Sequence, residues 1–501
     1  MLSRSQTVHL SLDRPTGNFW IDAGTVVLVR RFGAGTYPIQ TIMQGLVQQL
    51  VQPSGNRGQY FDPQTGEIRE YDKVNWVYPT NLFIKVSGSA PKVEIEDEKE
   101  KKKDEKEKKK YFTRPPVFDL KLKLSQKAGI CDICGDQAPL TEATMWMYPF
   151  VVDPQKFGTF YPGTKRGLRL CARCALAGLA GYLGWLWKAQ GRAALHFFIF
   201  HTTDLWELER FYREVIDPLR LEGDRGGNAP TAFAGPYLHE TTWGLLLALF
   251  AHVHASDQLS EEARRELAAL FGATDQPSTP LSLYVITGKP GRAFDMEALK
   301  EFSNLHRLYR LYERWWNLLR EKGISDNPHR QIVFIFEQFW AQQGQNRETI
   351  WRDKVAWAIL EFGDPSPFIE AFLYEARARE KSRRPLAWGT IEVLTTYLQE
   401  VFSMDEQFQK ILAGFGHSLG ESAQKNNEMG LLYALRNAKN PEDFYRVLND
   451  AQFRLQITIP EALLRIEKGE RIAGVPWIRV KTLLSIYAMN AYLRKESQQP
   501  G

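Results

Sequence analysis

The feature that most constrains this chain is the placement of its four cysteines. Cys131 and Cys134 form one Cys-x-x-Cys pair, Cys171 and Cys174 form a second, and the 501 residues contain no other cysteine. Each pair can occupy one edge of a tetrahedron, so together they supply the closed four-thiolate shell of a structural Zn²⁺ site. Gly135 suits the tight knuckle turn after the first pair. The ion is expected to tie the segment between the pairs to the body of its domain.

Two other interpretations of these cysteines stay open. The four thiols can stay reduced and hold no ion, or the site can have lost its metal. A redox dithiol is a weaker alternative, because one pair would be enough for that chemistry.

Composition limits the class of protein. Apolar residues make up 44% and aromatic residues 12% of the chain, which is enough for a substantial core and excludes global disorder. The length suggests about two to four domains. The net charge is only +5, so any nucleic acid must bind to local patches. No signal peptide is visible, and the most apolar run, residues 176–187, is too short to span a bilayer, so a cytoplasmic protein without a membrane partner is expected.

The sequence predicts an α+β fold, in which a mixed α/β domain with a zinc knuckle precedes an all-α helical bundle. Residues 1–88 form the first α/β part, 89–110 a charged linker, 111–385 the zinc-knuckle remainder of the same domain, and 386–501 the bundle. The mixed-charge run at 92–110 is typical of a solvated or disordered loop, although a lysine-rich arm that touches phosphates is an alternative.

Local patterns predict individual elements by periodicity and capping residues. Asp22 is expected to cap a helix that starts near Thr25, and Ser403 to begin a capping box. Asn440 and Pro441 fit the N-cap and first position of another helix. The expected strands are 7–13, 82–86, 196–200 and 283–286, with a hairpin over 59–71 and helices near 39–50 and 305–319.

Two basic glycine-containing segments are candidate phosphate contacts. Lys165, Arg166 and Arg169 lie between the cysteine pairs, where a rigid metal knuckle could hold them against a phosphate backbone. The alternative is a flexible surface loop. Lys289 and Arg292 follow an apolar strand, but the segment lacks a full P-loop pattern and equally suits a plain turn.

No catalytic constellation stands out. His252, His254 and Asp257 lie close together, with His239 and Glu240 upstream, but no pair of carboxylates suited to a metal nuclease accompanies them. Ordinary surface histidines explain this group. We therefore do not expect an enzyme.

The order of several motifs resembles a known family. They are Asn-Phe-Trp-Ile-Asp-Ala-Gly at 18–24, the two Cys-x-x-Cys pairs, a mixed α/β middle, and a helical end with Gly-Phe-Gly-His-Ser-Leu-Gly at 414–420 and Leu-Tyr-Ala-Leu-Arg-Asn-Ala at 432–438. In this order they resemble the Cys-x-x-Cys/Cys-x-x-Cys family of large subunits of type I CRISPR surveillance complexes (Cascade), subtype I-B or near it. The resemblance covers most of the chain, but residues 92–110 and 200–380 contribute little to it.

This resemblance implies a non-catalytic subunit that recognises the protospacer-adjacent motif (PAM) in double-stranded target DNA and helps to open the strands. CRISPR RNA supplies the sequence specificity. The implied partners are the Cascade backbone and small subunits and a helicase–nuclease recruited in trans. A small subunit made from an internal start at Met404 is a further implication.

Residue types suggest where such DNA contacts would lie. Asn18, Phe19 and Trp20 could supply the amide and the aromatic wedge of a minor-groove reader, or they could form a buried aromatic turn. Displaced-strand binding needs cations along the bundle. The candidates are Lys425, Arg436, Lys439, Arg446, Arg454, Arg479 and Lys481. A zinc-knuckle nucleic-acid-binding scaffold outside CRISPR, in a transposon or RNA-processing assembly, is the alternative function.

Overall fold

A computed structural model describes eleven stretches of the chain: 6–62, 64–84, 92–95, 110–113, 118, 120–149, 167–219, 228–255, 260–271, 280–379 and 384–497. The chain divides into two compact units. Unit 1 comprises Met1–Ala229 and Pro277–Ser303, and unit 2 comprises Pro230–Gln276 and Asn304–Gly501. The boundary expected at 385/386 falls inside unit 2.

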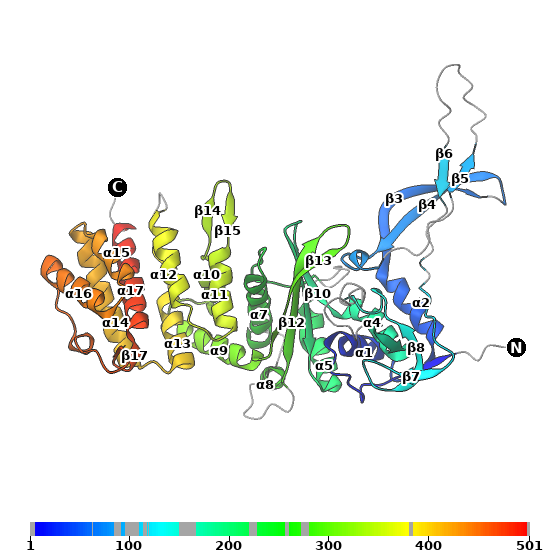
Figure 1. Ribbon diagram of the computed structural model, residues 1–501, viewed down its shortest axis with the longest axis horizontal. Coiled ribbons are helices and arrows are strands. Elements are labelled where there is room, and N and C mark those ends of the chain that lie inside the picture. Colours follow the sequence, from blue (N-terminus) through cyan, green and yellow to red (C-terminus); the bar gives the residue numbers. More distant parts are fainter. Residues whose placement is uncertain are drawn as a thin grey trace, which may run out of the picture. The chain divides into compact units, whose positions relative to one another are not determined.

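Unit 1 is mixed α/β (Figure 1). Its main sheet is antiparallel, with the strand order β10-β11-β12-β13, and its cysteine region contains a three-stranded sheet with the order β7-β8-β9. Its strands are β1 (Thr7–Leu10), β2 (Gly35–Pro38), β3 (Val51–Asp62), β4 (Glu67–Trp76), β5 (Lys92–Ile95), β6 (Lys110–Thr113), β7 (Ala128–Ile130), β8 (Gln137–Glu142), β9 (Arg169–Cys171), β10 (Leu186–Gln190), β11 (Ala194–His201), β12 (Ser282–Pro290) and β13 (Phe294–Phe302). Its helices are α1 (Phe19–Phe32), α2 (Ile39–Leu50), α4 (Ala172–Gly184), α5 (Leu205–Phe211) and α6 (Asp217–Leu219), with a π-helical turn at Tyr212–Ile216.

Unit 2 is helical, with two short hairpins among its described residues. Its helices are α7 (Leu238–Ala255), α8 (Glu261–Leu270), α9 (Leu305–Glu321), α10 (Pro328–Glu337), α11 (Ile350–Leu360), α12 (Ser366–Glu375), α13 (Thr390–Phe402), α14 (Glu406–Lys425), α15 (Met429–Asn437), α16 (Pro441–Leu455) and α17 (Trp477–Ser497). The hairpins are β14 (Ala341–Gln343) with β15 (Asn346–Glu348), and β16 (Arg471–Ile472) with β17 (Val475–Pro476). The C-terminal helical region is thus confirmed, but it includes the β16–β17 hairpin and is not all-α.

Most of the expected elements are present. The strand expected at 7–13 is shorter in the structure, where β1 ends at Leu10. The helix near 39–50 is α2, and the hairpin at 59–71 is the outer part of the longer β3–β4 hairpin. The strands at 196–200 and 283–286 lie inside β11 and β12, and the helix at 305–319 is α9. The central part of the charged run, 96–109, lies outside the described residues, while its ends contribute to the paired strands β5 and β6.

Three local predictions were wrong. Helix α1 begins at Phe19 because the Asn18 side chain, not that of Asp22, accepts the free amides of the first turn. Leu82 ends a 3₁₀ helix that starts at Thr80, so residues 82–84 are not a strand. Asp405, not Ser403, caps α14, because Ser403 adopts a left-handed conformation (φ 51°) that terminates α13.

The core of unit 1 depends on a close contact between α1 and α4. A Cβ atom at Gly24 would overlap the carbonyl oxygen of Ala177, so only glycine lets the two backbones approach. The Trp20 indole is fully buried beside this contact, and its Nε1 donates to the Gly178 carbonyl oxygen at 2.9 Å. Edge-to-face contacts of Trp20 with Trp185 extend the packing toward β10.

Replacing Gly24 by alanine should therefore destabilise unit 1 by about 3 kcal/mol, because backbone atoms cannot move aside as a flexible side chain can. Urea unfolding followed by tryptophan fluorescence measures this change. The matched control is Gly414→Ala at an exposed position of α14. A Cβ atom there meets no atom within 4 Å and should stabilise the helix by up to about 1 kcal/mol. Equal unfolding midpoints for the two variants would contradict the contact.

A buried ion pair links α7 to α11 in unit 2. The Glu240 carboxylate is fully buried; its Oε2 lies 3.4 Å from Nη1 of Arg352, and its Oε1 accepts from Thr349 Oγ1 at 2.8 Å. Burial raises the pKa of Glu240 to about 7, although the Arg352 guanidinium acts in the opposite direction. The folded chain therefore holds this proton more tightly than an unfolded chain.

Because the folded-state pKa is raised, the contribution of Glu240 to stability should fall as the pH rises from 4.5, the ordinary value of its pKa, to about 7. The Glu240→Gln variant lacks this titration. We expect the stability of the wild type relative to this variant to fall by up to about 3 kcal/mol across that window. Urea unfolding at several pH values tests this, and a constant difference between the two proteins would refute it.

Candidate metal centre and cationic surfaces

Three elements bring the four cysteines together. Cys131 and Cys134 flank the turn between β7 and β8, Cys171 ends β9, and Cys174 lies in the first turn of α4. Gly135 has φ +73°, the left-handed conformation that the knuckle turn requires. The Gly135 amide donates to the Cys131 carbonyl oxygen at 3.0 Å, which closes the turn.

The geometry of the cluster fits a tetrahedral ion. All four Sγ atoms lie within 4.8 Å of one another, and the Cys134 and Cys171 sulfurs are 3.7 Å apart. Zn–S bonds of about 2.3 Å in a tetrahedron place sulfurs about 3.8 Å apart. Cys131, Cys171 and Cys174 are buried and Cys134 is half-buried, so the donor set is largely shielded from water.

Hydrogen bonds prepare two of the thiols to become thiolates. The Cys174 thiol, followed by the Asp136 amide and the Arg173 guanidinium, lowers the pKa of Cys134 to about 6, against the effect of burial. The Cys171 thiol lowers the pKa of Cys131 most. Hydrogen bonding to Cys131 raises the pKa of both Cys171, to about 12, and Cys174.

Arg173 is a cationic side chain in contact with this cluster, because its guanidinium hydrogen-bonds to Cys134. Its Nη1 donates to the Arg14 carbonyl oxygen at 3.1 Å, and its Nη2 lies 3.4 Å from Asp136 Oδ2. Its guanidinium can offset part of the negative charge of four thiolates around a divalent ion. The position of Arg173 directly before Cys174 is the sequence signal for this role.

The three candidate residues at the start of α1 differ in their burial and in their contacts. Trp20 is fully buried, and the Asn18 side chain is occupied at both ends: Oδ1 accepts from the amides of Trp20 and Ile21, and Nδ2 donates to the Tyr148 hydroxyl. Phe19 is half-buried and stacks on Tyr284 at 4.4 Å. The alternative of a buried aromatic turn therefore describes Trp20, whereas Asn18 is half-buried and its side chain caps α1 and contacts Tyr148.

The basic segment between the cysteine pairs is only partly described. Lys165 and Arg166 lie outside the described residues, whereas Arg169 is in β9 and its side chain is 39% exposed. Its Nε is 4.0 Å from Asp132 Oδ2, too far for a strong ion pair. Arg169 is thus a cation beside the cysteine cluster that an anionic partner could reach.

The second basic segment is a β-hairpin turn. Lys289 lies within β12 and pairs with Glu297 at 2.7 Å, while Arg292 is exposed in the turn before β13. The Gly291 amide donates to the Ala293 carbonyl oxygen at 3.0 Å. The plain-turn interpretation accounts for this geometry without a ligand.

Most candidate cations of the bundle have partners within unit 2. Lys481 is buried, and its Nζ donates to the Arg436 carbonyl oxygen at 2.7 Å. Lys425 and Lys439 are exposed and form no ion pair with any residue in the described ranges. The paired arginines are Arg436 with Glu375, Arg446 with Asp443, Arg454 with Glu428, and Arg479 with Asp364.

The histidines considered for a nuclease do not assemble a metal site in the described part of the chain. His254 Nδ1 faces Glu313 at 3.6 Å, and His239 Nδ1 lies 3.3 Å from Asp353 Oδ2. Burial lowers the pKa of His252. Asp257 lies outside the described residues.

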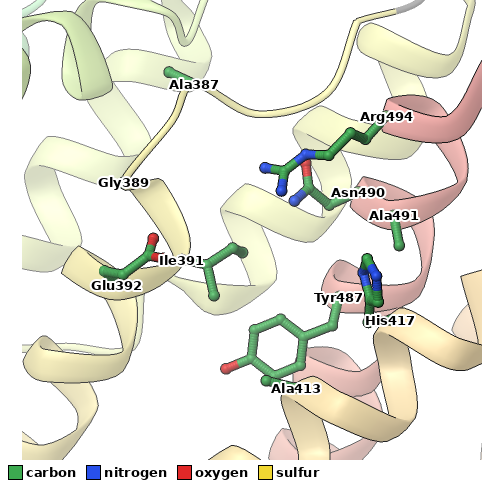
Figure 2. A pocket seen from close by; sticks show the side chains of 10 residues that line it. All are labelled: Ala387, Gly389, Ile391, Glu392, Ala413, His417, Tyr487, Asn490, Ala491 and Arg494. Carbon is green, nitrogen blue, oxygen red and sulfur yellow. The ribbon is translucent and has the colours of Figure 1, made fainter. Parts of the chain in front are cut away.

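A cavity of about 170 Å³ lies among α13, α14 and α17 (Figure 2). Glu392 lines one wall, and His417, Asn490 and Arg494 line the opposite wall. His417 Nε2 has its carboxylate partner in Glu421, at 3.7 Å, rather than in Glu392. Asn490 Oδ1 accepts from the Leu386 amide at 2.8 Å, which fixes the loop before α13. The polar groups here support the packing of the loop and do not form an acid–base pair.

Sequence reasoning missed a larger groove on α9. The groove has a volume of about 500 Å³ and lies where α9 meets α13 and the end of α11. Arg307, Arg310 and Arg314 line it from one helix face. The signal is present in the sequence as cations at i, i+3 and i+7 of the helix predicted at 305–319, on the face opposite its buried apolar residues.

No protein-family model and no curated protein sequence matches the chain. Across the described ranges, every helix is too short or too polar to serve as a membrane span.

The cysteine geometry predicts one Zn²⁺ per chain, measured by elemental mass spectrometry of protein purified without added metal. Cys174→Ser should abolish retention of the ion, because the remaining three thiolates leave the shell open. Arg173→Met should keep all four ligands but lower zinc affinity by roughly 10- to 100-fold in a competition assay with a chromogenic chelator.

Arg14→Met is the matched control, because this neighbouring arginine is exposed and meets the Asp136 carboxylate only at 3.6 Å. It should leave zinc affinity within about two-fold of the wild type. Full zinc retention by Cys174→Ser would contradict a four-thiolate site.

Proposed function

We propose that the chain is the non-catalytic large subunit of an RNA-guided type I CRISPR surveillance complex, with structural zinc in its cysteine cluster. In this role it recognises the PAM in target DNA, helps to open the strands, binds the displaced strand and recruits a helicase–nuclease. The observation that carries the proposal is the convergence of both Cys-x-x-Cys pairs on one tetrahedral site in a mixed α/β unit. The order of motifs along the chain supplies the link to this family.

The cysteine cluster supports a specific DNA-facing region. Zinc would hold β9 and the start of α4 in fixed positions, so Arg169 would project from a rigid edge. Lys165 and Arg166 belong to the same connection between the cysteine pairs. Phe19 is the one remaining aromatic candidate from the start of α1, since Trp20 is buried. The proposal therefore assigns phosphate and groove contacts near the PAM to these four side chains.

A zinc-knuckle scaffold outside CRISPR is the second candidate function. The same tetrathiolate cluster favours it, because zinc knuckles also support binding of RNA and single strands in other assemblies. The two functions differ in their partners: the scaffold needs neither guide RNA nor backbone subunits.

Purification of the tagged chain from its native host, or from a co-expressed operon, tests the proposal. We expect CRISPR RNA with repeat-derived 5′ ends and the backbone subunits to co-purify, and mass spectrometry to detect a shorter product that begins at Met404. The Cys174→Ser variant serves as the comparison and should recover less complex. Recovery of the chain alone, or with unrelated RNA, would reject the CRISPR role and favour the scaffold.

A further inference from the structure

The α9 groove presents a row of arginines to solvent. Arg307, Arg310, Arg314 and Asn317 are all exposed and project from one face of the helix. At a rise of about 1.5 Å per residue, the Cα atoms of successive arginines in this row lie about 4.5 and 6 Å apart along the helix axis. Successive phosphates of a nucleic-acid strand are spaced on the same order.

The acidic partner of Arg314 in this row is itself exposed to solvent. Arg314 pairs with Glu400 at 3.4 Å, but the two side chains are 67% and 43% exposed, so water screens their attraction. Glu313 also lines the groove, but its carboxylate accepts a hydrogen bond from Tyr309 and faces His254 at 3.6 Å. A phosphate could therefore replace Glu400 as the partner of Arg314 at little cost.

An aromatic platform lies at the Arg307 end of the groove. The Arg307 guanidinium lies over the Phe362 ring at 4.1 Å from its centroid. Phe362 follows α11 with φ +54°, a conformation that bulky residues rarely adopt, and the bond from the Gly363 amide to the Ala358 carbonyl oxygen (2.7 Å) holds the turn. The stacked pair presents a flat face that suits a nucleobase.

We infer that this groove binds one strand of nucleic acid, with consecutive phosphates on Arg307, Arg310 and Arg314 and a base stacked on the Arg307–Phe362 pair. The inference rests on the proposed nucleic-acid-binding function and places its single-strand site on α9, outside the 386–501 region and its candidate cations. Planar guanidinium groups suit bidentate phosphate contacts, and the aromatic pair favours a nucleic acid over an acidic peptide.

Binding of a fluorescein-labelled single-stranded DNA to the full chain tests the inference. The variant Arg307→Gln/Arg310→Gln/Arg314→Gln should lose affinity about ten-fold or more at about 50 mM salt, and its log–log salt slope should fall by about 2. The control Arg330→Gln/Arg465→Gln/Lys468→Gln removes the same charge from exposed positions of unit 2 and should change affinity less than about two-fold.

The Glu400→Gln variant should raise the affinity for DNA, whereas the arginine variants should lower it. Removal of the competing carboxylate should tighten DNA binding by about two- to five-fold, which a loss of folding could not produce. Equal losses in the two triple variants, or no gain in Glu400→Gln, would overturn the site, and so would equally effective competition by polyglutamate.

These outcomes can be separated from failure of the proposed function. If no guide RNA co-purifies but the groove variants behave as expected, the CRISPR role fails and the groove stands. If guide RNA co-purifies but the α9 triple variant binds DNA like its control, the groove alone is refuted.

Discussion

The close contact of α1 with α4 is the interaction on which the rest of unit 1 depends. Gly24 and Gly181 let the two helices approach until the Trp20 ring lies directly on the Gly181 backbone. The same helix α4 begins at the second cysteine pair, so its N-terminus is constrained by the cysteine cluster and its middle by glycine packing. Two independent constraints on one short helix leave little freedom in where Cys171 and Cys174 lie.

The charged side chains of unit 2 mainly stabilise the fold through contacts with other residues of the unit. Several arginines both pair with a carboxylate and lie over an aromatic ring, as Arg436 does with Glu375 and Tyr374 and Arg479 with Asp364 and Phe402. Such side chains cannot move to a ligand without losing two contacts. A cation is therefore informative about binding only where its partner is weak or exposed, which distinguishes Arg314 from Arg479.

The sequence predicted features that depend on local rules. Periodicity located α2, α9 and β11, and the spacing of the cysteines predicted their convergence. The predictions that failed concern residues whose hydrogen-bond partners lie far away in the sequence. Asp22 has the right residue type for a cap, but three groups from Thr16 and Gly17 and the ring of His201 bind its carboxylate inside the core. The burial of Lys481 likewise depends on a carbonyl 45 residues away in sequence, which no local pattern reveals.

The path of the chain means that part of unit 2 is synthesised before the main sheet of unit 1 is complete. The strand β11 is followed by residues 230–276 of unit 2 before β12 and β13 complete the sheet of unit 1. During translation, the central strand β11 must therefore keep one edge unpaired until β12, which ends at Pro290, has been synthesised. All eight residues of β11 are buried in the folded unit, and an unpaired apolar strand edge is prone to aggregation. The order of synthesis therefore exposes the chain to aggregation during this interval.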